Sequence, residues 1–279
     1  MRVIRSKAEL RKIIKGVKGK RLIGLVPTMG YLHQGHLSLV RIARRRSQFL
    51  VVSIYVNPTQ FGPGEDFKEY PRDLDHDLTL LEKEKVDLVF APDDLYEKDH
   101  STYVVEEKLA QGLCGRHRPG HFRGVTTVVT KLFNLIEPDL AVFGTKDFQQ
   151  AKVIRRMVRD LDFDIEIILG PTIREPDGLA ISSRNEYLTG DERRQATVLY
   201  RSLKEAKKMI EAGVRDPETI REKMAGMIEA GSGDIDYIEI VDPDSLDPIT
   251  KIKDHALIAL AVRIGRTRLI DNLLWETKR

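Results

Sequence analysis

The fold is decided by the stretch Val26-Pro27-Thr28-Met29-Gly30-Tyr31-Leu32-His33-Gln34-Gly35-His36, which places two histidines three residues apart. An apolar run over 21–26 precedes the histidines and predicts a strand, and an amphipathic run over 37–46 follows them and predicts a helix. Backbone N–H groups at a helix N-terminus are unpaired and carry partial positive charge, so they favour phosphate. Imidazoles add donors that can follow charge developing on a phosphoryl group. The stretch therefore indicates chemistry on a nucleotide.

Apolar and amphipathic runs alternate through the first half of the chain. Strand patterns occur at 21–26, 49–56, 86–90, 139–143 and 164–169, and helix patterns at 37–46, 74–85, 125–136 and 148–160. The second strand is apolar almost throughout, as expected when both faces of a parallel sheet are covered. This alternation predicts a doubly wound, Rossmann-like α/β parallel sheet.

The pattern changes after about Pro171. A polar, irregular segment over 174–189 leads into a long charged amphipathic helix predicted at 191–212 and a second helix at 217–229. Strand patterns then occur at 235–241 and 256–262. We therefore predict two domains: a Rossmann-like domain over 1–173 and a smaller α+β domain over 174–279.

Composition excludes several classes of protein. The 279 residues include 46 Lys and Arg against 43 Asp and Glu, and this net charge of +3 is too balanced to indicate nucleic-acid binding. The single cysteine, Cys114, allows no intrachain disulfide, and no signal-peptide pattern is present, so we expect the reducing cytoplasm. The longest apolar runs are too short to span a bilayer, and we expect no membrane partner.

Three more segments carry polar side chains suited to a nucleotide or a hydroxylated substrate. In 144–150, Lys146 can neutralise phosphate oxygens and Asp147 can cap the following helix. Segment 181–185 places two hydroxyls beside Arg184, and 57–62 offers two amides. Taken alone, 144–150 is more typical of an ordinary turn and 181–185 of a solvated surface loop, and ordinary turn chemistry explains 57–62 almost as well. Because loops that follow parallel strands meet at one edge of the sheet, we expect His33 and His36, 57–60 and 144–147 to lie together.

Two features of the sequence leave alternatives open. His33 and His36 are spaced to chelate a metal, but no third ligand stands at a recognisable spacing, which favours the phosphate role. The basic segment 116–124 suits a carboxylate or a phosphate, and equally a plain surface loop.

Taken in order, these segments resemble the pantoate–β-alanine ligase (pantothenate synthetase) family over nearly the whole chain. The landmarks are His33-Gln34-Gly35-His36, Asn57-Pro58-Thr59-Gln60-Phe61-Gly62, Tyr70-Pro71-Arg72, Arg118-Pro119-Gly120-His121-Phe122-Arg123-Gly124, Gly144-Thr145-Lys146-Asp147-Phe148-Gln149-Gln150 and Ser182-Ser183-Arg184-Asn185. The histidine motif alone is shared with the wider HIGH-motif nucleotidyltransferase superfamily, whereas the ordered set is specific to this ligase.

The resemblance implies a two-step, ATP-dependent reaction in pantothenate and coenzyme A biosynthesis. The pantoate carboxylate attacks the α-phosphorus of ATP and releases pyrophosphate, and the amine of β-alanine then displaces AMP from the pantoyl adenylate. The resemblance also implies Mg²⁺ bridging the phosphates, a cytoplasmic homodimer, a first domain that binds nucleotide and pantoate, and a second domain that acts as a lid.

The resemblance also carries site residues over. ATP binding is implied for Met29, Gly30, Tyr31, Leu32, His33, Gln34, Gly35, His36, Gly144, Thr145, Lys146, Asp147, Ile173, Ile181, Ser182, Ser183 and Arg184. His36 is the implied proton donor, and His33 and Lys146 complete the catalytic set. Gln60 and Gln150 are implied to bind the substrate pantoate. Asp77 is an outer candidate for Mg²⁺, on a loose alignment of Asp75-His76-Asp77.

Three other functions compete with the ligase. A sister adenylyltransferase would act on a phosphate acceptor, but Gln60, Gln150 and the second domain favour a hydroxylated, uncharged substrate end. A tRNA synthetase would need an RNA-binding appendage, for which a net charge of +3 on 279 residues leaves little room. A nucleotide sensor on the same fold would bind ATP without releasing AMP.

Overall fold

The computed structural model describes residues 1–277, and its contacts divide them into two compact units. The N-terminal unit comprises Met1–Glu107, Arg118–Thr145 and Gln150–Thr172. The C-terminal unit begins its main part at Ile173 and also includes the short segments Lys108–His117 and Lys146–Gln149. The predicted second domain, 174–279, extends two residues beyond the described part.

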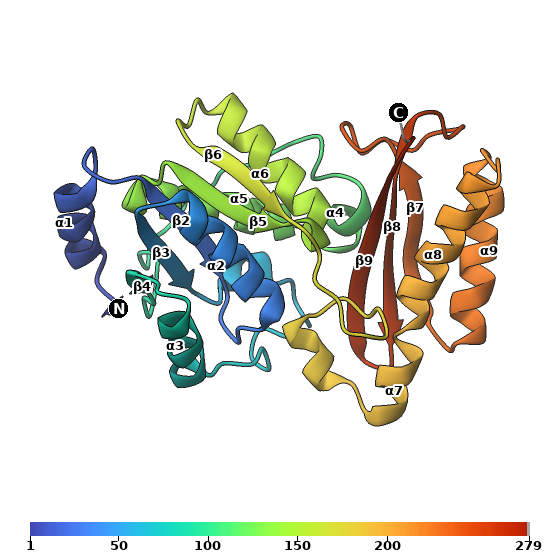
Figure 1. Ribbon diagram of the computed structural model, residues 1–279, viewed down its shortest axis with the longest axis horizontal. Coiled ribbons are helices and arrows are strands. Elements are labelled where there is room, and N and C mark those ends of the chain that lie inside the picture. Colours follow the sequence, from blue (N-terminus) through green and yellow to red (C-terminus); the bar gives the residue numbers. More distant parts are fainter. Residues whose placement is uncertain (278–279) are drawn as a thin grey trace. The chain divides into compact units, whose positions relative to one another are not determined.

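A six-stranded parallel sheet forms the centre of the N-terminal unit (Figure 1). Its strands, in the order β1-β4-β3-β2-β5-β6, are β1 (Arg2–Ile4), β4 (Leu88–Phe90), β3 (Phe49–Ile54), β2 (Ile23–Thr28), β5 (Leu140–Gly144) and β6 (Glu166–Gly170). Strand β2 pairs with both β3 and β5. On one side of β2 the order continues through β3, β4 and β1, and on the other side through β5 and β6. This is the topological switch point at which doubly wound sheets bind ligands. The predicted Rossmann-like fold is confirmed.

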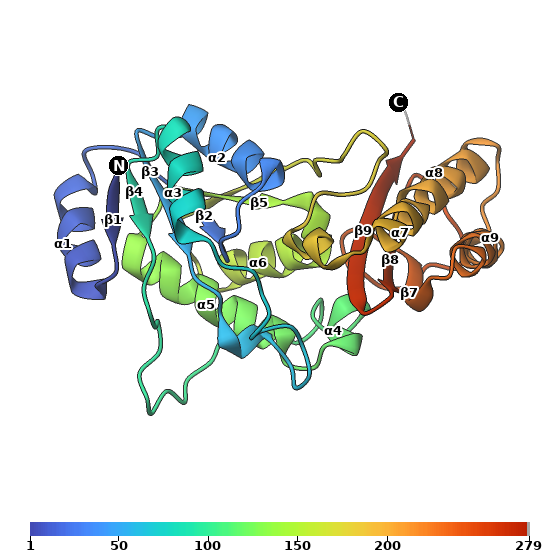
Figure 2. The same cartoon turned by 90° about the horizontal axis from the view of Figure 1, so that it is seen from below.

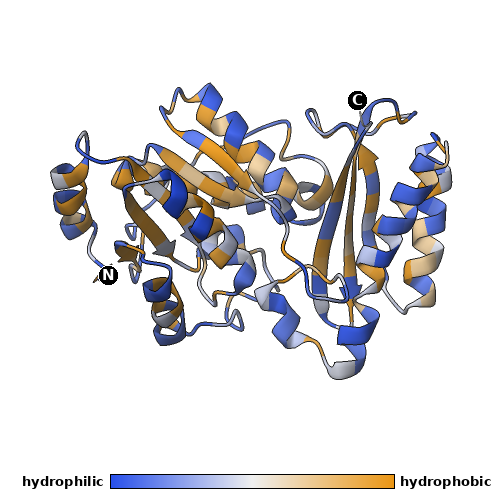
Figure 3. Cartoon of the chain, in the orientation of Figure 1, coloured by the Kyte–Doolittle hydropathy of each residue, from blue (hydrophilic) through white to orange (hydrophobic). Residues whose placement is uncertain are grey.

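Helices cover both faces of this sheet (Figure 2). Two hydrophobic cores lie on the two faces of the sheet. The first core contains residues of α1 (Lys7–Val17), α5 (His121–Ile136) and α6 (Phe148–Asp160). The second contains residues of α2 (Gln34–Arg46) and α3 (Leu74–Lys83). Successive residues of a strand point to opposite faces, so Leu25 belongs to the first core and Val26 to the second, both fully buried. Figure 3 shows the result as strands that are hydrophobic along most of their length.

The C-terminal unit contains a three-stranded antiparallel sheet in the order β7 (Asp234–Val241), β8 (His255–Ile264) and β9 (Thr267–Glu276). Helices α8 (Val198–Glu211) and α9 (Pro217–Ala230) share a core with these strands. Shorter elements are α4 (Leu113–His117), α7 (Gly190–Gln195) and the 3₁₀ turn η3 (Ser183–Tyr187). The predicted smaller α+β part is confirmed. Within residues 1–277, no helix combines the length and the apolar composition that crossing a membrane requires.

The single helix predicted at 191–212 is wrong, because the chain forms α7 and α8 with a break between them. Ala196 ends α7, and its N–H bonds to the carbonyls of Arg194 and Glu192. Helical periodicity continues through the break without a glycine or a proline, so the sequence carries no stop signal.

Several elements, including α4, lie where no strand or helix is predicted. Strand β1 has three residues, of which only Ile4 is buried. Helix α1 starts at the N-cap Ser6, whose side chain accepts the Glu9 N–H. In β9 the apolar alternation is interrupted by Asp271, which is buried although it is charged.

Candidate active site

The loop between β2 and α2 arranges its two histidines as a reciprocal cap. Nδ1 of His33, the N-cap residue, accepts the Gly35 N–H at 3.2 Å, and Nδ1 of His36 accepts the His33 N–H at 3.4 Å. The pattern is that of a capping box, with imidazoles in place of the usual hydroxyl and carboxylate. A Cβ at Gly35 would lie 2.9 Å from the His33 ring, so glycine lets that ring fold over the helix start.

These hydrogen bonds determine which ring atoms can donate. Nδ1 accepts in both rings, so the proton of each neutral imidazole is on Nε2. The rings are stacked, with centroids 4.0 Å apart and planes 29° apart. The pair therefore suits donation from Nε2 to an anion at the N-terminus of α2.

Asp77 of α3 accepts hydrogen bonds from the backbone of the same loop. Its Oδ2 accepts the Tyr31 N–H at 2.8 Å, its Oδ1 accepts the Leu32 N–H at 2.6 Å, and the residue is 1% exposed. Burial raises the pKa of the Asp77 carboxyl, and the two backbone hydrogen bonds offset this only in part. Tyr31 has a φ of 52°, a conformation that costs energy for a non-glycine residue and needs such support.

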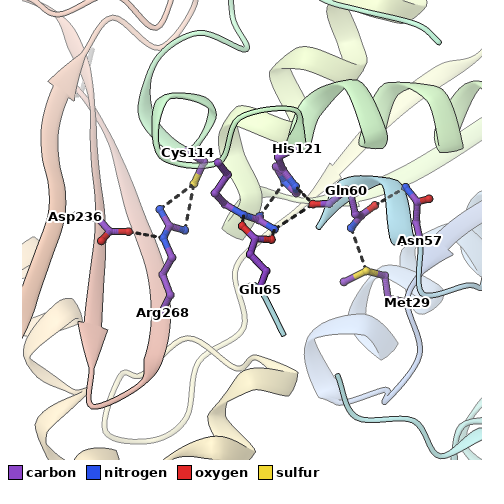
Figure 4. A network of polar contacts seen from close by, with 9 residues as sticks. Met29, Asn57, Gln60, Glu65, Cys114, His121, Asp236 and Arg268 are labelled. Carbon is purple, nitrogen blue, oxygen red and sulfur yellow. Dashed lines mark hydrogen bonds and ion pairs between the residues drawn. The ribbon is translucent and has the colours of Figure 1, made fainter. Parts of the chain in front are cut away.

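The loop after β3 meets the loop after β2 through Gln60 (Figure 4). This glutamine closes the 3₁₀ turn η1 (Pro58–Gln60) and is 9% exposed. Its Nε2 donates to Sδ of Met29 at 3.0 Å, and its Oε1 accepts from Nδ2 of Asn57 at 3.1 Å. The structure thus brings together predicted ATP-binding and pantoate-binding residues within the N-terminal unit. Asn57 is not among the predicted site residues, although its place after a buried strand was a usable signal.

The segment after β5 contributes residues to both units. Gly144 ends β5 and Thr145 begins the following turn, both in the N-terminal unit, where Oγ1 of Thr145 lies 3.4 Å from Oγ1 of Thr172. Lys146 and Asp147 belong to the C-terminal unit and are half-buried in the 3₁₀ turn η2 (Thr145–Asp147), and the Lys146 carbonyl accepts from Asn272 at 2.8 Å.

The two neighbouring glutamines of α6 differ in their surroundings. Gln150 is half-buried in the N-terminal unit. Gln149 is buried in the C-terminal unit, where Nε2 donates to the carbonyls of Leu109 and Gly112, both at 2.8 Å, and Oε1 accepts the Cys114 N–H at 3.0 Å. These contacts account for Gln149 as a structural residue.

The five remaining predicted ATP contacts, Ile173, Ile181, Ser182, Ser183 and Arg184, lie together in the C-terminal unit. The Ile181 N–H donates to the Ile173 carbonyl at 3.0 Å, and Oγ of Ser182 caps η3 by accepting the Arg184 N–H at 3.3 Å. Arg174, which follows Ile173 in the sequence, forms a forked ion pair with Asp271 of β9, at 2.6 and 2.8 Å. Asp271 is 3% exposed, so the segment is fixed to the sheet by a buried pair that sequence reasoning missed.

Among residues 1–277, one group of side chains has the spacing of a three-ligand metal site: Asp242, Asp244 and His255 in the C-terminal unit. Two of the three are exposed, and none is a predicted site residue. Nε2 of His255 lies 3.3 Å from a carboxylate oxygen of Asp242, which explains their proximity without an ion.

Comparison with known proteins agrees with this geometry. The family model described as pantoate-beta-alanine ligase matches residues 2–274. A pantothenate synthetase of Pseudothermotoga lettingae is 53% identical over 277 residues, covering 98% of this chain and 99% of the relative. A pantothenate synthetase of Thermoanaerobacter sp. is 57% identical over 273 residues, covering 96% of each chain.

Solved structures give the same result. Pantothenate synthetase from Thermus thermophilus superposes with a TM-score of 0.92 at 46% identity, covering 98% of this chain and 99% of the other. Pantoate–β-alanine ligase from Francisella tularensis, solved in complex with β,γ-ATP and β-alanine, has a TM-score of 0.85 at 34% identity, covering 100% of this chain and 99% of the other. The chain therefore belongs to the pantoate–β-alanine ligase family, the enzymes that condense pantoate with β-alanine in an ATP-dependent reaction.

Proposed function

We propose that this ligase activates pantoate as a pantoyl adenylate before β-alanine reacts. A carboxylate is a poor acylating agent until one of its oxygens belongs to a leaving group. In the first step a pantoate oxygen bonds to the α-phosphorus of ATP, and the bond to pyrophosphate breaks. In the second step the β-alanine nitrogen bonds to the carbonyl carbon and loses a proton, and AMP leaves. The reciprocal cap of His33 and His36 at a helix N-terminus is the observation that carries this proposal.

The residues divide between charge stabilisation and nucleotide binding. Nε2 of His36 donates to the phosphate oxygens where negative charge develops, with His33 beside it. Lys146 adds a positive charge on the same phosphates. The remaining residues that bind ATP are Met29, Gly30, Tyr31, Leu32, Gln34, Gly35, Gly144, Thr145, Asp147, Ile173, Ile181, Ser182, Ser183 and Arg184.

The proposal also covers pantoate binding, the ligands of Mg²⁺ and the oligomeric state. The uncharged amides of Gln60 and Gln150 suit the hydroxyl and carboxylate oxygens of pantoate. Both oxygens of Asp77 already accept backbone N–H groups, so a bound Mg²⁺ would be held chiefly by ATP phosphates and water, as magnesium prefers. By family resemblance we also propose a homodimer located in the cytoplasm.

We expect pantoate-dependent exchange of labelled pyrophosphate into ATP in the absence of β-alanine. Adenylate formation is reversible, so the label enters ATP only if pyrophosphate is released before the amine reacts. Mass spectrometry of the same mixture should detect pantoyl adenylate. Exchange with phosphopantetheine in place of pantoate would support the sister adenylyltransferase, and ATP binding without AMP release when both substrates are present would support a sensor.

Replacing Asp77 with asparagine should lower the exchange rate about tenfold, because an amide offers one acceptor oxygen to two N–H donors, and an unsatisfied buried group costs about 1–3 kcal/mol. Steady-state exchange with Mg²⁺ varied tests this, and the Mg²⁺ concentration for half-maximal rate should not change. Asp75→Asn, at an exposed position of the same helix, is the control. A selective rise in the Mg²⁺ requirement of Asp77→Asn would instead identify Asp77 as a metal contact.

A further inference from the structure

The basic segment Arg118–Gly124 has no role in the reaction described so far, yet two of its side chains converge on one atom. Nδ1 of His121 lies 2.8 Å from the main-chain oxygen of Gln60, and Nη2 of Arg118 donates to the same oxygen at 3.3 Å. All three residues belong to the N-terminal unit, and Figure 4 shows His121 directed at Gln60. The segment therefore holds the backbone at the residue proposed to bind pantoate.

Arg118 is itself held rigidly by Glu65. Nε of Arg118 donates to Oε1 of Glu65 at 2.7 Å, and Nη2 donates to Oε2 at 2.6 Å, which is the forked geometry of a strong ion pair. The Arg118 side chain is 14% exposed and that of Glu65 24%. Burial raises the pKa of the Glu65 carboxyl, but the hydrogen bonds and charge of Arg118 outweigh burial and lower this pKa to about 2. Both partners are therefore charged at neutral pH.

The remaining nitrogen of Arg118 determines which tautomer His121 adopts. Nη1 of Arg118 lies 3.1 Å from Nε2 of His121. An arginine side chain has no acceptor, so Nε2 must accept, and the imidazole proton must be on Nδ1, where it is donated to the Gln60 oxygen. Glu65, Arg118 and His121 thus form one chain of hydrogen bonds that ends on Gln60.

The Gln60 side chain is held as well. Asn57 is 1% exposed, and its Nδ2 donates both to Oε1 of Gln60 and to the Gly124 carbonyl, each at 3.1 Å. Nε2 of Gln60 contacts Sδ of Met29, a weak acceptor, and carries a second hydrogen. The amide oxygen is occupied by Asn57, so this arrangement presents Gln60 to a substrate as a donor.

The same contacts argue against direct anion binding by Arg118. Its guanidinium is neutralised by Glu65, and each of its nitrogens already donates to Glu65, Gln60 or His121. A guanidinium that bound a substrate carboxylate would have to give up this pair.

We propose that Glu65, Arg118 and His121 are positioning residues that fix Gln60 as the hydrogen-bond donor to pantoate. This inference rests on the proposed role of Gln60 in pantoate binding. It assigns the basic segment to substrate recognition through Gln60, without contact between the segment and the substrate.

The test is the KM for pantoate in pyrophosphate exchange, with ATP saturating. Glu65→Gln removes one charge of the ion pair, and Arg118→Lys keeps the charge but loses the fork. We expect each to raise the KM for pantoate about tenfold, since hydrogen bonds to charged groups are the strong ones, with the KM for ATP within about twofold of wild type. Arg118→Lys keeps the test available if Glu65→Gln does not fold, as judged by circular dichroism.

A matched control and a double variant separate positioning from general damage. Glu166→Gln breaks an exposed contact with Arg46 in the same unit, where Nη2 reaches both carboxylate oxygens at 3.0 and 2.9 Å, and should leave both KM values unchanged. If Glu65 acts through Gln60, the double variant Gln60→Ala/Glu65→Gln should bind pantoate no worse than Gln60→Ala alone.

Three outcomes would overturn the positioning role, and they differ in what else they reject. A normal pantoate KM in both Glu65→Gln and Arg118→Lys, with a raised KM in Gln60→Ala, rejects the positioning role alone. Full additivity in the double variant rejects it too, since Glu65 would then act independently of Gln60. A normal pantoate KM in Gln60→Ala rejects the proposed role of Gln60 together with the inference built on it.

Discussion

Replacing His36 with alanine is expected to lower kcat for adenylate formation about 10²–10³-fold, because one preorganised donor to the charge of the transition state is lost. The fold should persist, since removing a helix cap typically costs about 1 kcal/mol. Pyrophosphate exchange measures the first effect and thermal unfolding the second. His76→Ala, at an exposed position of the same unit, should change neither.

His36→Asn separates capping from catalysis. An asparagine oxygen stands at the same place along the side chain as Nδ1, so it can accept the His33 N–H, but it leaves no donor where Nε2 was. This variant should unfold near the wild-type temperature and still lose activity as His36→Ala does. If either variant turned over at the wild-type rate, His36 would not be a catalytic residue.

Replacing Gly124 with alanine is expected to produce the largest loss of stability. A Cβ at this position would lie 2.3 Å from the Thr59 oxygen and 2.6 Å from Cα of Gln60, both backbone atoms that no rotamer change can move. Overpacking a core costs about 1–3 kcal/mol, and here we expect the upper end, about 3 kcal/mol. The Tm should fall by about 6–12 °C, at 2–4 °C for each kcal/mol in a unit of this size.

A second glycine supplies the control for Gly124→Ala. Gly16 lies in α1 of the same unit, and a Cβ there would meet nothing within 4 Å. Gly16→Ala should therefore raise stability slightly, by about 0.5–1 kcal/mol. Equal Tm values for the two variants would show that α5 and η1 are less closely packed than the structure indicates.

The parallel sheet was predictable because burial on both faces leaves a simple signal. Leu25 and Val26 point to opposite layers and are both fully buried, so the run that contains them is apolar without interruption. Strand β1 gave no such signal, since two of its three residues are exposed. The break between α7 and α8 escaped prediction because no glycine or proline marks it, and Ala196, where α7 ends, is a buried apolar residue that fits the helical pattern.

The candidate site was predictable where its residues are close in sequence or directly follow parallel strands. His33 and His36 stand out because a strand, a glycine and a helix surround them. Asp77 contacts the same loop from 46 residues away, and Arg118 reaches Gln60 across 58. Residue type does not reveal such contacts, because Asp77 resembles any acidic residue of a helix first turn and Arg118 any basic loop residue. The family resemblance supplied expected roles for the substrate contacts. The structure supplied the contacts of Asp77 and Arg118 that hold the backbone of those loops.

The ion pair between Glu65 and Arg118 has a consequence for substrate choice. A lone arginine beside Gln60, the amide proposed to bind pantoate, would attract any small carboxylic acid, and the enzyme would adenylate the wrong ones. With its charge cancelled by Glu65, this arginine gives acids without the pantoate hydroxyls no electrostatic advantage. Discrimination then depends on whether an acid can satisfy a fixed, desolvated amide, a criterion on which a missing hydroxyl is penalised more heavily than a missing methylene.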